Sequence, residues 1–471
     1  MSEQQDFVGS ILMPSIHGYV AAEPELGRPD TGGQVTFVLE LAKCLAALGY
    51  RVDILTRRFD DQPEVDPIDR GLRVWRVPFG GPDFLRKEDM HDHLDELLAN
   101  LLAEIKSREL SYDLVSSHYW DAGWLGQQVA EHLKIPHVHT PHSLGSWKKQ
   151  DMEGLPAETR EGFRFDERIE KEFLVYRHAD QVVATTHQQA DILGRDYGLP
   201  AGQVTVIPPG MDESRFTPVR PEELGALRRR LGFRQTDVYS VGRAATNKGY
   251  GLLIRSLPAV QELVPNVRLR LAVGANSSQD RRLIRRWQSL AQELGVAERV
   301  KWLGYVPDDA MADHYRAAGV FALASRYEPF GMTAIEAMGC GTPTVVTVHG
   351  GLHELIDFGE QALFADPKRP VELAAMLSLP LRYPRLRDRL SIEGARFARR
   401  HFGWMGIAGR TAELFESFRG RYRNLWQRKG GETKDRRLPA EPESDGRIQP
   451  RRDSGSSASN SAGTVSSVRV M

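Results

Sequence analysis

Short apolar strands alternate with longer amphipathic stretches along most of this 471-residue chain. Such alternation is typical of βαβ units, in which helices cover a parallel sheet. The pattern therefore predicts an α/β fold. The expected strands, in chain order, are Phe7–Met13, Arg51–Thr56, Leu72–Val77, Asp113–Ser117, His137–Thr140, Asp180–Thr185, a strand opening at Val238, Arg268–Val273, Val300–Leu303, Val320–Ala324 and Thr344–Val348.

A proline–glycine stretch, Pro208-Pro209-Gly210, indicates a boundary between two halves. Asp180–Thr185 is the last strand expected before it, and the tract Asp388–Gln427 is expected to be helical. The predicted domains are residues 1–212 and 213–403, followed by a helix over 404–428. Residues 429–471 are Gly-, Ser-, Glu- and Arg-rich, which predicts a disordered tail because too little apolar surface offsets the ordering entropy.

Composition limits the possible functions. With 41% hydrophobic residues the chain can bury two large cores, and its formal charge of −1 argues against a general binder of nucleic acids or membrane surfaces. Cys44 and Cys340 are the only two cysteines, which favours a reducing compartment. The polar N-terminus shows no signal peptide, and no apolar run approaches the ~18 residues of a membrane span. We therefore expect a cytoplasmic protein without a membrane span or a nucleic-acid partner.

The stretch from Glu328 to Glu336 joins an apolar strand to a helix. Pro329 and Gly331 break the strand, and Thr333–Met338 has the small and apolar residues of a packed helix. A helix that opens there directs free N–H groups and a positive dipole end at the turn, which suits a diphosphate. The two carboxylates could accept hydrogen bonds from sugar hydroxyls. The spacing alone fits a helix with two ordinary acids equally well.

This stretch resembles the donor-site signature of retaining, two-domain glycosyltransferases. The resemblance includes the string Glu-Ala-Met-x-x-Gly-x-Pro, which overlaps the end of the stretch. The similar enzymes are of the glycogen-synthase and sucrose-phosphate-synthase kind, in glycosyltransferase family 4. The resemblance covers roughly residues 8–427. It implies the GT-B fold, in which two Rossmann-like domains face each other across a cleft and the last helix crosses back to the first domain. It also implies that Glu328 contacts the donor sugar and Glu336 the ribose, with Phe330, Gly331, Met332 and Thr333 also at the donor.

Two further segments suit a nucleotide sugar. Arg243 and Lys248 lie on a loop before the expected helix Tyr250–Leu263, where they could neutralise a diphosphate leaving group, although two solvated cations are the alternative. The glycine-rich segment Glu25–Gln34 would let backbone approach a ligand, although a plain tight turn explains it as well. The resemblance implies that Arg243 and Lys248 clamp the donor phosphates and that Gly32 and Gly33 line the donor. Ala244 and Ala245 stand where many relatives carry an acid.

The acceptor side follows the strands of the first half. His142 comes just after one of them, although a lone histidine is more often structural. His-Ser-Leu-Gly-x-x-Lys resembles the catalytic histidine and acceptor-phosphate lysine of the family, which implies those roles for His142 and Lys148. Arg168, on the expected helix Phe165–Arg177, resembles a second phosphate contact, although its charged neighbours also fit a solvated face. The resemblance adds Gln34, Lys87, Tyr119 and Ser143, and a cluster of cations suits a phosphorylated acceptor.

The family resemblance implies same-face transfer with retention, in which the leaving diphosphate helps to take the acceptor proton. The expected catalytic residues are His142, Glu328, Arg243 and Lys248. No Asp-x-Asp motif or metal-ligand spacing is found in the sequence, so we expect neither a metal nor a cofactor.

Strings such as His17–Ala22, Ser117–Gly123 and Asn247–Tyr250 resemble mannosylfructose-phosphate synthases more than sucrose-phosphate synthases. They imply transfer from GDP-mannose to fructose 6-phosphate, with a separate phosphatase acting afterwards. UDP-glucose as donor, giving sucrose 6-phosphate, is the alternative, as is a related transferase with another acceptor. A phosphorylase would need a pyridoxal-phosphate lysine signature, which is not found, and a regulator without turnover could lose the donor acids. An epimerase would need no acceptor pocket.

Overall fold

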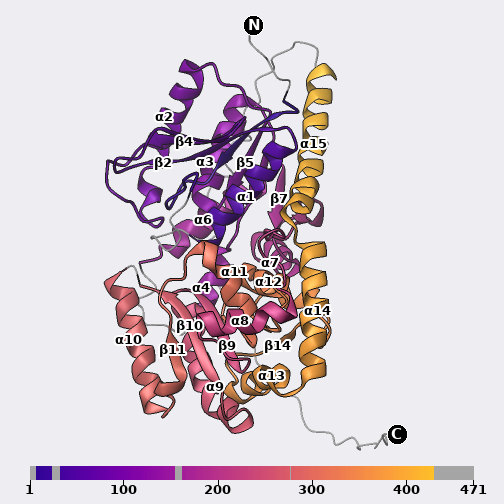
Figure 1. Cartoon of the computed structure of the whole chain (residues 1–471). Helices are drawn as coiled ribbons and strands as arrows, with labels where there is room; N and C mark the ends of the chain where they lie inside the picture. The colour runs from indigo at the N-terminus through magenta and orange to yellow at the C-terminus, as the bar shows by residue number, and fades with distance from the viewer. Residues whose placement is uncertain (1–6, 24–31, 154–161, 276, 429–471) are drawn as a thin grey trace, which may run out of the picture. The chain divides into compact units, whose positions relative to one another are not determined.

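Two sheets organise the chain, as Figure 1 shows for the computed structural model, which describes residues 7–23, 32–153, 162–275 and 277–428. The first sheet has eight strands in the order β3-β4-β2-β1-β5-β6-β7-β8, and the second has six in the order β11-β10-β9-β12-β13-β14. Every pairing is parallel except that of β3 with β4. The prediction of an α/β protein with two parallel-sheet domains is confirmed.

The first sheet contains β1 Ser10–Pro14, β2 Arg51–Arg58, β3 Val65–Asp69, β4 Leu72–Pro78, β5 Leu114–His118, β6 His137–Thr140, β7 Gln181–Ala184 and β8 Val204–Val206. The second contains β9 Asp237–Arg243, β10 Arg268–Gly274, β11 Val300–Trp302, β12 Val320–Leu323, β13 Thr344–Thr347 and β14 Leu363–Ala365. The sequence predicted all of these except β3, β8 and β14. All three lie at sheet edges; β3 carries two acids and a proline, and β8 and β14 have only three residues each. The expectation that Asp180–Thr185 is the last strand of the first half is therefore wrong, because β8 follows it.

The helices of the first half are α1 Gly33–Ala47, α2 Leu94–Ser107, α3 Trp120–Leu133, α4 Gly145–Asp151, α6 Phe165–His178 and α7 His187–Tyr197. Those of the second are α8 Pro221–Leu231, α9 Tyr250–Leu263, α10 Ser278–Glu293, α11 Asp308–Ala317, α12 Met332–Gly339, α13 Pro370–Arg382, α14 Pro384–His401 and α15 Trp404–Arg428. The tract expected to be helical over Asp388–Gln427 is helical in α14 and α15, with a break at Phe402 and Gly403.

Helix α15 packs against the first sheet. Trp404, Ile407 and Phe415 belong to the same buried cluster as the inward residues of α1, β1 and β2. Tyr50 OH donates a hydrogen bond of 2.7 Å to Glu416 Oε1. Figure 1 shows the start of α15 continuing from α14 along one side of the chain.

The two segments that connect the halves are bonded to each other. Met211, on the first connection, donates its N–H to the carbonyl of Phe402 at 2.7 Å, and Met211 also bridges to Gly403. A Cβ on Gly210 would lie 2.5 Å from the Trp404 ring, so a side chain there would displace the start of α15. The predicted domain boundary at Pro208-Pro209-Gly210 coincides with this paired crossing.

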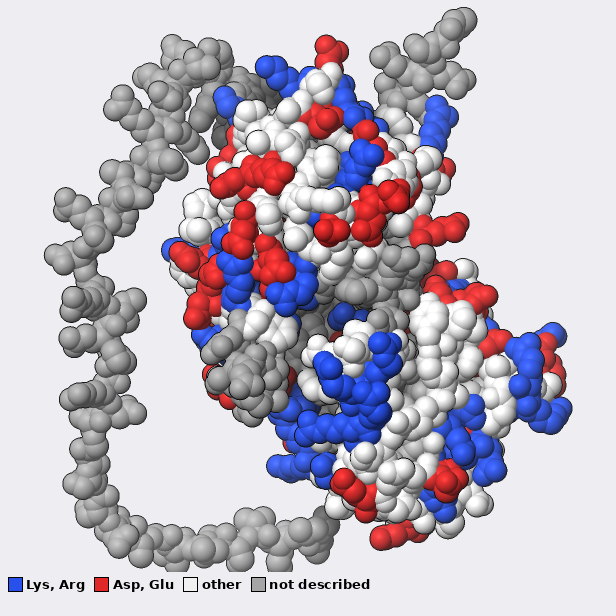
Figure 2. All heavy atoms as spheres, turned by 90° about the vertical axis from the view of Figure 1, so that its left-hand side faces the viewer, with Lys and Arg blue, Asp and Glu red and all other residues white. Residues whose placement is uncertain are grey.

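Charges of both signs are interspersed over the face in Figure 2, with Lys and Arg side chains gathered in its lower half. Helix α10, at the left of Figure 1, exposes Arg281, Arg282, Arg285 and Arg286. In the described part of the chain no helix is long and apolar enough to cross a membrane. Cys44 and Cys340 are both free thiols. Residues 25–31 of the glycine-rich segment and the predicted tail 429–471 lie outside the described residues.

Candidate active site

Two strained residues stand at the carboxyl ends of adjacent strands. Tyr119, after β5, has φ 80°, and His142, two residues after β6, has φ 60°. Residues other than glycine rarely adopt such angles, and the strain concentrates at functional sites. Because β5 and β6 pair in parallel, both residues lie at the sheet edge where α/β proteins bind ligands.

His142 is held in a defined orientation. Its Nε2 lies 2.9 Å from His118 Nδ1, and its ring meets Phe37 edge-on with centroids 4.8 Å apart. Burial, together with the neighbouring His118 and His17, lowers the pKa of His142 well below its ordinary value. A neutral imidazole can exchange hydrogen bonds with a sugar hydroxyl without bringing charge. Sequence reasoning missed His118; its position at the end of β5, beside Tyr119, was the available signal.

Arg168 organises the predicted acceptor residues. Its Nη1 donates to Tyr119 OH at 2.8 Å and its Nη2 to the Ser143 carbonyl at 2.7 Å. Its Nε donates to Glu172 Oε1 at 2.7 Å, and Glu172 also accepts the Gly145 N–H. Arg168 and Glu172 are 3% and 0% exposed, so the solvated-face interpretation of this helix is wrong. Most of the guanidinium donors thus hold Tyr119, Ser143 and Glu172 in place.

Lys148 lies among other cations. Its Nζ is 4.3 Å from the centroid of the Phe163 ring. Burial, followed by the charges of Arg168, Lys87 and Arg243, lowers the pKa of Lys148 to about 7. The structure therefore brings three predicted acceptor cations close to one predicted donor cation. Repulsion among these cations raises the free energy of the unliganded protein, so the arrangement favours binding of an anionic ligand.

Arg57 holds the loop that carries Lys87 in place through hydrogen bonds. The Arg57 guanidinium, on β2, donates to the carbonyls of Phe79 at 2.9 Å, Asp83 at 2.7 Å and Gly81 at 2.8 Å. Lys87 Nζ itself lies 3.4 Å from Glu88 Oε1. Arg57 was not predicted as a site residue, because an arginine inside a strand usually reaches solvent.

At the donor side, two predicted catalytic residues form one ion pair. Lys248 Nζ lies 2.7 Å from Glu328 Oε2, and Ser325 Oγ donates to the same oxygen at 2.8 Å. Gly249 follows Lys248 with φ 74°, and a Cβ there would lie 1.7 Å from the Ala324 carbonyl. Only glycine lets the Lys248 turn pack this closely against the end of β12.

The opening of α1 meets the second half. A Cβ on Gly32 would lie 3.7 Å from Arg243 Nε, and one on Gly33 would lie 3.5 Å from Met332 Sδ. Arg243 is exposed and makes no ion pair with the described residues. Four residues that the sequence assigned to donor binding, from three separate segments, are therefore brought together.

The remaining predicted residues differ in their surroundings. Glu336 accepts a hydrogen bond of 2.8 Å from Tyr315 OH, and burial raises its pKa to about 7 despite that bond. Gly331 caps α12 with φ 114° next to the partly buried Thr333. The Phe330 ring packs against Phe402 in the core of the second half, so only its backbone could meet a donor.

Gln34, in the first turn of α1, donates from Nε2 to Ser15 Oγ at 3.3 Å. This bond places Gln34 beside the end of β1, and its contact with the acceptor stays a prediction.

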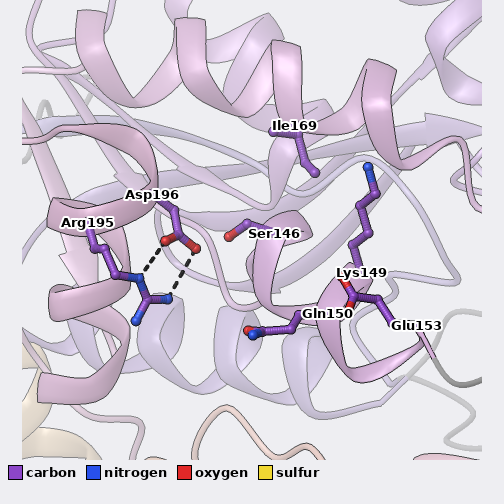
Figure 3. Close-up of a pocket in the computed structure, with 7 residues that line it drawn as sticks. All are labelled: Ser146, Lys149, Gln150, Glu153, Ile169, Arg195 and Asp196. Carbon is purple, nitrogen blue, oxygen red and sulfur yellow. Dashed lines mark hydrogen bonds and ion pairs between the residues drawn. The ribbon is translucent and has the colours of Figure 1, made fainter. Parts of the chain in front are cut away.

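A separate hollow lies beside α4, α6 and α7 (Figure 3). It is lined by Ser146, Lys149, Gln150, Glu153, Ile169, Arg195 and Asp196. Arg195 and Asp196 pair with each other at 2.7 Å. None of these residues was predicted for the site, and the cations discussed above do not line the hollow.

Known proteins resemble this chain over most of its length. Residues 31–215 match "Glycosyltransferase Family 4" and residues 227–397 match "Glycosyl transferases group 1". A mannosylfructose-phosphate synthase of Agrobacterium fabrum is 50% identical over 412 residues, which cover 86% of this chain and 91% of that protein. A D-inositol 3-phosphate glycosyltransferase of Xylanimonas cellulosilytica is 34% identical over 412 residues, covering 86% and 96%.

Among solved structures, a sucrose-phosphate synthase of Thermosynechococcus elongatus superimposes with a TM-score of 0.77 at 29% identity, covering 89% of this chain and 100% of that one. The Anabaena protein HepE, in complex with UDP and glucose, superimposes with a TM-score of 0.66 at 20% identity, covering 87% and 100%. That second likeness concerns the fold alone.

Proposed function

This chain belongs to glycosyltransferase family 4, and from that membership we propose that it transfers mannose from GDP-mannose to fructose 6-phosphate. The observation that carries the acceptor class is the convergence of Lys148, Lys87 and Arg168; burial, followed by these neighbouring charges, lowers the pKa of Lys148 to about 7. A sugar phosphate would add negative charge and hydrogen-bond acceptors beside these cations. The 50% identity to a mannosylfructose-phosphate synthase supports mannose as the hexose.

The residues of the donor side suit a departing diphosphate. Arg243 and Lys248 supply positive charge where the leaving group gains negative charge, and the opening of α12 adds its dipole. Glu328 is ion-paired with Lys248, and the proposed same-face transfer requires no covalent intermediate on this carboxylate. The neutral His142 would hold a donor hydroxyl, and Glu336 would accept from the ribose.

The second candidate is transfer of glucose from UDP-glucose. The superposition with a sucrose-phosphate synthase at 29% identity favours it, because the two folds agree over nearly the whole chain. Glucose and mannose differ at one hydroxyl, so either hexose fits the same arrangement of cations.

An assay of every donor with every acceptor tests the proposed reaction. Purified protein would be incubated with GDP-mannose, GDP-glucose, UDP-glucose or ADP-glucose, each with fructose 6-phosphate or free fructose, and the product identified by mass spectrometry and NMR. We expect the highest kcat/KM with GDP-mannose and fructose 6-phosphate. A preference for UDP-glucose would replace the mannosyl assignment by the glucosyl one. Equal use of free fructose would remove the role proposed for Lys148 and Arg168.

We expect transfer to be independent of divalent metals, because Arg243, Lys248 and the α12 N-terminus provide the positive charge. Excess EDTA should leave the initial rate unchanged within error, measured on protein previously passed over a chelating resin. A rate abolished by EDTA and restored by magnesium or manganese would contradict this proposal.

The product of the proposed reaction still carries the acceptor phosphate. A sugar-phosphate phosphatase is therefore the enzyme class that would consume it and draw the transfer forward.

A further inference from the structure

Tyr327 lies on the segment that leaves β12, yet its side chain contacts the first half of the chain. It is 5% exposed, and its OH lies 3.1 Å from Ser143 Oγ. Its ring meets Trp147 edge-on, with centroids 4.6 Å apart. A residue from the predicted donor half therefore completes one wall of the predicted acceptor side.

The Tyr327 hydroxyl contacts Ser143, which Arg168 also contacts. Arg168 Nη2 donates to the Ser143 carbonyl at 2.7 Å and lies 3.3 Å from Ser143 Oγ. Burial raises the pKa of Tyr327, so the phenol stays protonated at physiological pH. Tyr327, Ser143 and Arg168 thus form one hydrogen-bonded chain that ends beside Lys148.

The backbone around Tyr327, unlike its side chain, is hydrogen-bonded to the loop that carries Lys248. Arg326 donates its N–H to the Asn247 carbonyl at 2.7 Å, and Asn247 Nδ2 donates to the Tyr327 carbonyl at 3.3 Å. The next residue, Glu328, pairs with Lys248 at 2.7 Å. Consecutive residues therefore face the two substrate sides, Tyr327 the acceptor and Glu328 the donor.

We propose that Tyr327 is a positioning residue that couples binding of the acceptor phosphate to the placement of Glu328 and Lys248 at the donor. This inference rests on the proposed function. A phosphate bound by Lys148 and Arg168 orders Ser143, which fixes Tyr327 and, through the adjoining backbone, the Glu328–Lys248 pair. Coupling of this kind is reciprocal, so a nucleoside diphosphate at the donor side tightens acceptor binding by the same factor.

Tyr327→Phe isolates the hydroxyl, because phenylalanine keeps the ring contact with Trp147. The dissociation constant of fructose 6-phosphate would be measured by calorimetry with and without GDP, on wild type and variant. One neutral hydrogen bond contributes about 0.5–1.5 kcal/mol, so we expect the tightening caused by GDP to shrink about 2- to 12-fold in the variant. The KM for fructose 6-phosphate should rise, and the ratio of donor hydrolysis to transfer should increase.

Two controls separate coupling from a general loss of packing. Tyr383→Phe removes the hydroxyl of a tyrosine that is 51% exposed and lies at the start of α14. It should leave both the affinity for fructose 6-phosphate and the ratio of donor hydrolysis to transfer unchanged. Ser143→Ala combined with Tyr327→Phe should cost no more coupling than Ser143→Ala alone, because Ser143→Ala already removes the bond to Tyr327. Melting temperatures within about one degree of each other would show that the folds are equivalent.

Two results would overturn the inference. One is a Tyr327→Phe protein with the coupling factor and hydrolysis ratio of the wild type; the other is a wild type in which GDP leaves fructose 6-phosphate affinity unchanged. Failure of this inference can be told apart from failure of the proposed function, because the assay of donors and acceptors with the wild-type protein identifies the substrates. If UDP-glucose is the donor, the same measurement is made with UDP.

Discussion

Arg243→Ala is expected to lower kcat about a hundred- to a thousandfold, the usual effect of removing one preorganised group that stabilises developing negative charge. The corresponding loss of transition-state stabilisation is about 2.7–4 kcal/mol. Arg243 is exposed and makes no ion pair with the described residues, so its removal leaves no buried partner uncompensated. Turnover should therefore fall while the melting temperature stays near that of the wild type. Steady-state kinetics with saturating acceptor, alongside thermal unfolding, measures both quantities.

The matched control is Arg281→Ala, on the exposed face of α10. Arg281 has the same charge and is exposed like Arg243, but it is not part of the predicted donor site. It should retain wild-type kcat, which excludes a simple effect of net charge on nucleotide binding. If Arg243→Ala kept the wild-type kcat/KM, Arg243 would not be part of the phosphate clamp.

Lys248→Ala differs from Arg243→Ala in a way that the structure predicts. Lys248 is the ion-pair partner of Glu328, whose side chain is 11% exposed. Its removal leaves a largely buried carboxylate without its countercharge, and burying an uncompensated charge is unfavourable. A combined loss of turnover and of thermal stability would therefore distinguish the role of Lys248 from that of Arg243.

The predicted strands were recognised from short runs that contain apolar residues, although β6, His-Val-His-Thr, is mostly polar. Strand β12 is buried throughout, and β6 was predicted with its observed bounds. Strand β3 was missed because Val-Asp-Pro-Ile-Asp carries two acids and a proline, which a sheet tolerates only at its edge. The break at Gly403 lies at the predicted boundary between residues 403 and 404, but its pairing with Met211, nearly 200 residues earlier in the chain, could not be predicted.

The candidate site was predictable where residue type and local sequence carried the signal, as with Lys148 and Arg243. What could not be read was how these residues pair. Lys248 and Glu328 were assigned to different parts of the donor, whereas the structure joins them in one ion pair. Tyr327 was passed over because an aromatic residue before a glutamate fits core packing equally well. Its contact with Ser143 depends on how two segments 184 residues apart meet.

Acceptor binding is expected to weaken above pH 7 because Lys148 must be protonated to hold a phosphate. In the free protein, burial and the charges of Arg168, Lys87 and Arg243 lower its pKa to about 7. A bound phosphate dianion favours the ammonium form, so above that pH binding takes up a proton. Affinity should fall by up to about tenfold per pH unit until the pKa of the complex is reached. Below pH 7 Lys148 is charged, and affinity falls only as the phosphate itself is protonated, near its second pKa of about 6.

Lys148→Arg is the decisive comparison, since a guanidinium stays charged throughout this range. Its KM for fructose 6-phosphate should lose the rise above pH 7, whatever its absolute value. Lys148→Met should bind roughly 10- to 150-fold more weakly at pH 7, the value of one charge-assisted hydrogen bond of about 1.5–3 kcal/mol, and should also lack the rise. Calorimetry in buffers of different ionisation enthalpy measures the proton uptake directly. A Lys148→Arg profile that keeps the wild-type rise would assign the titration to another group and place Lys148 outside the phosphate site.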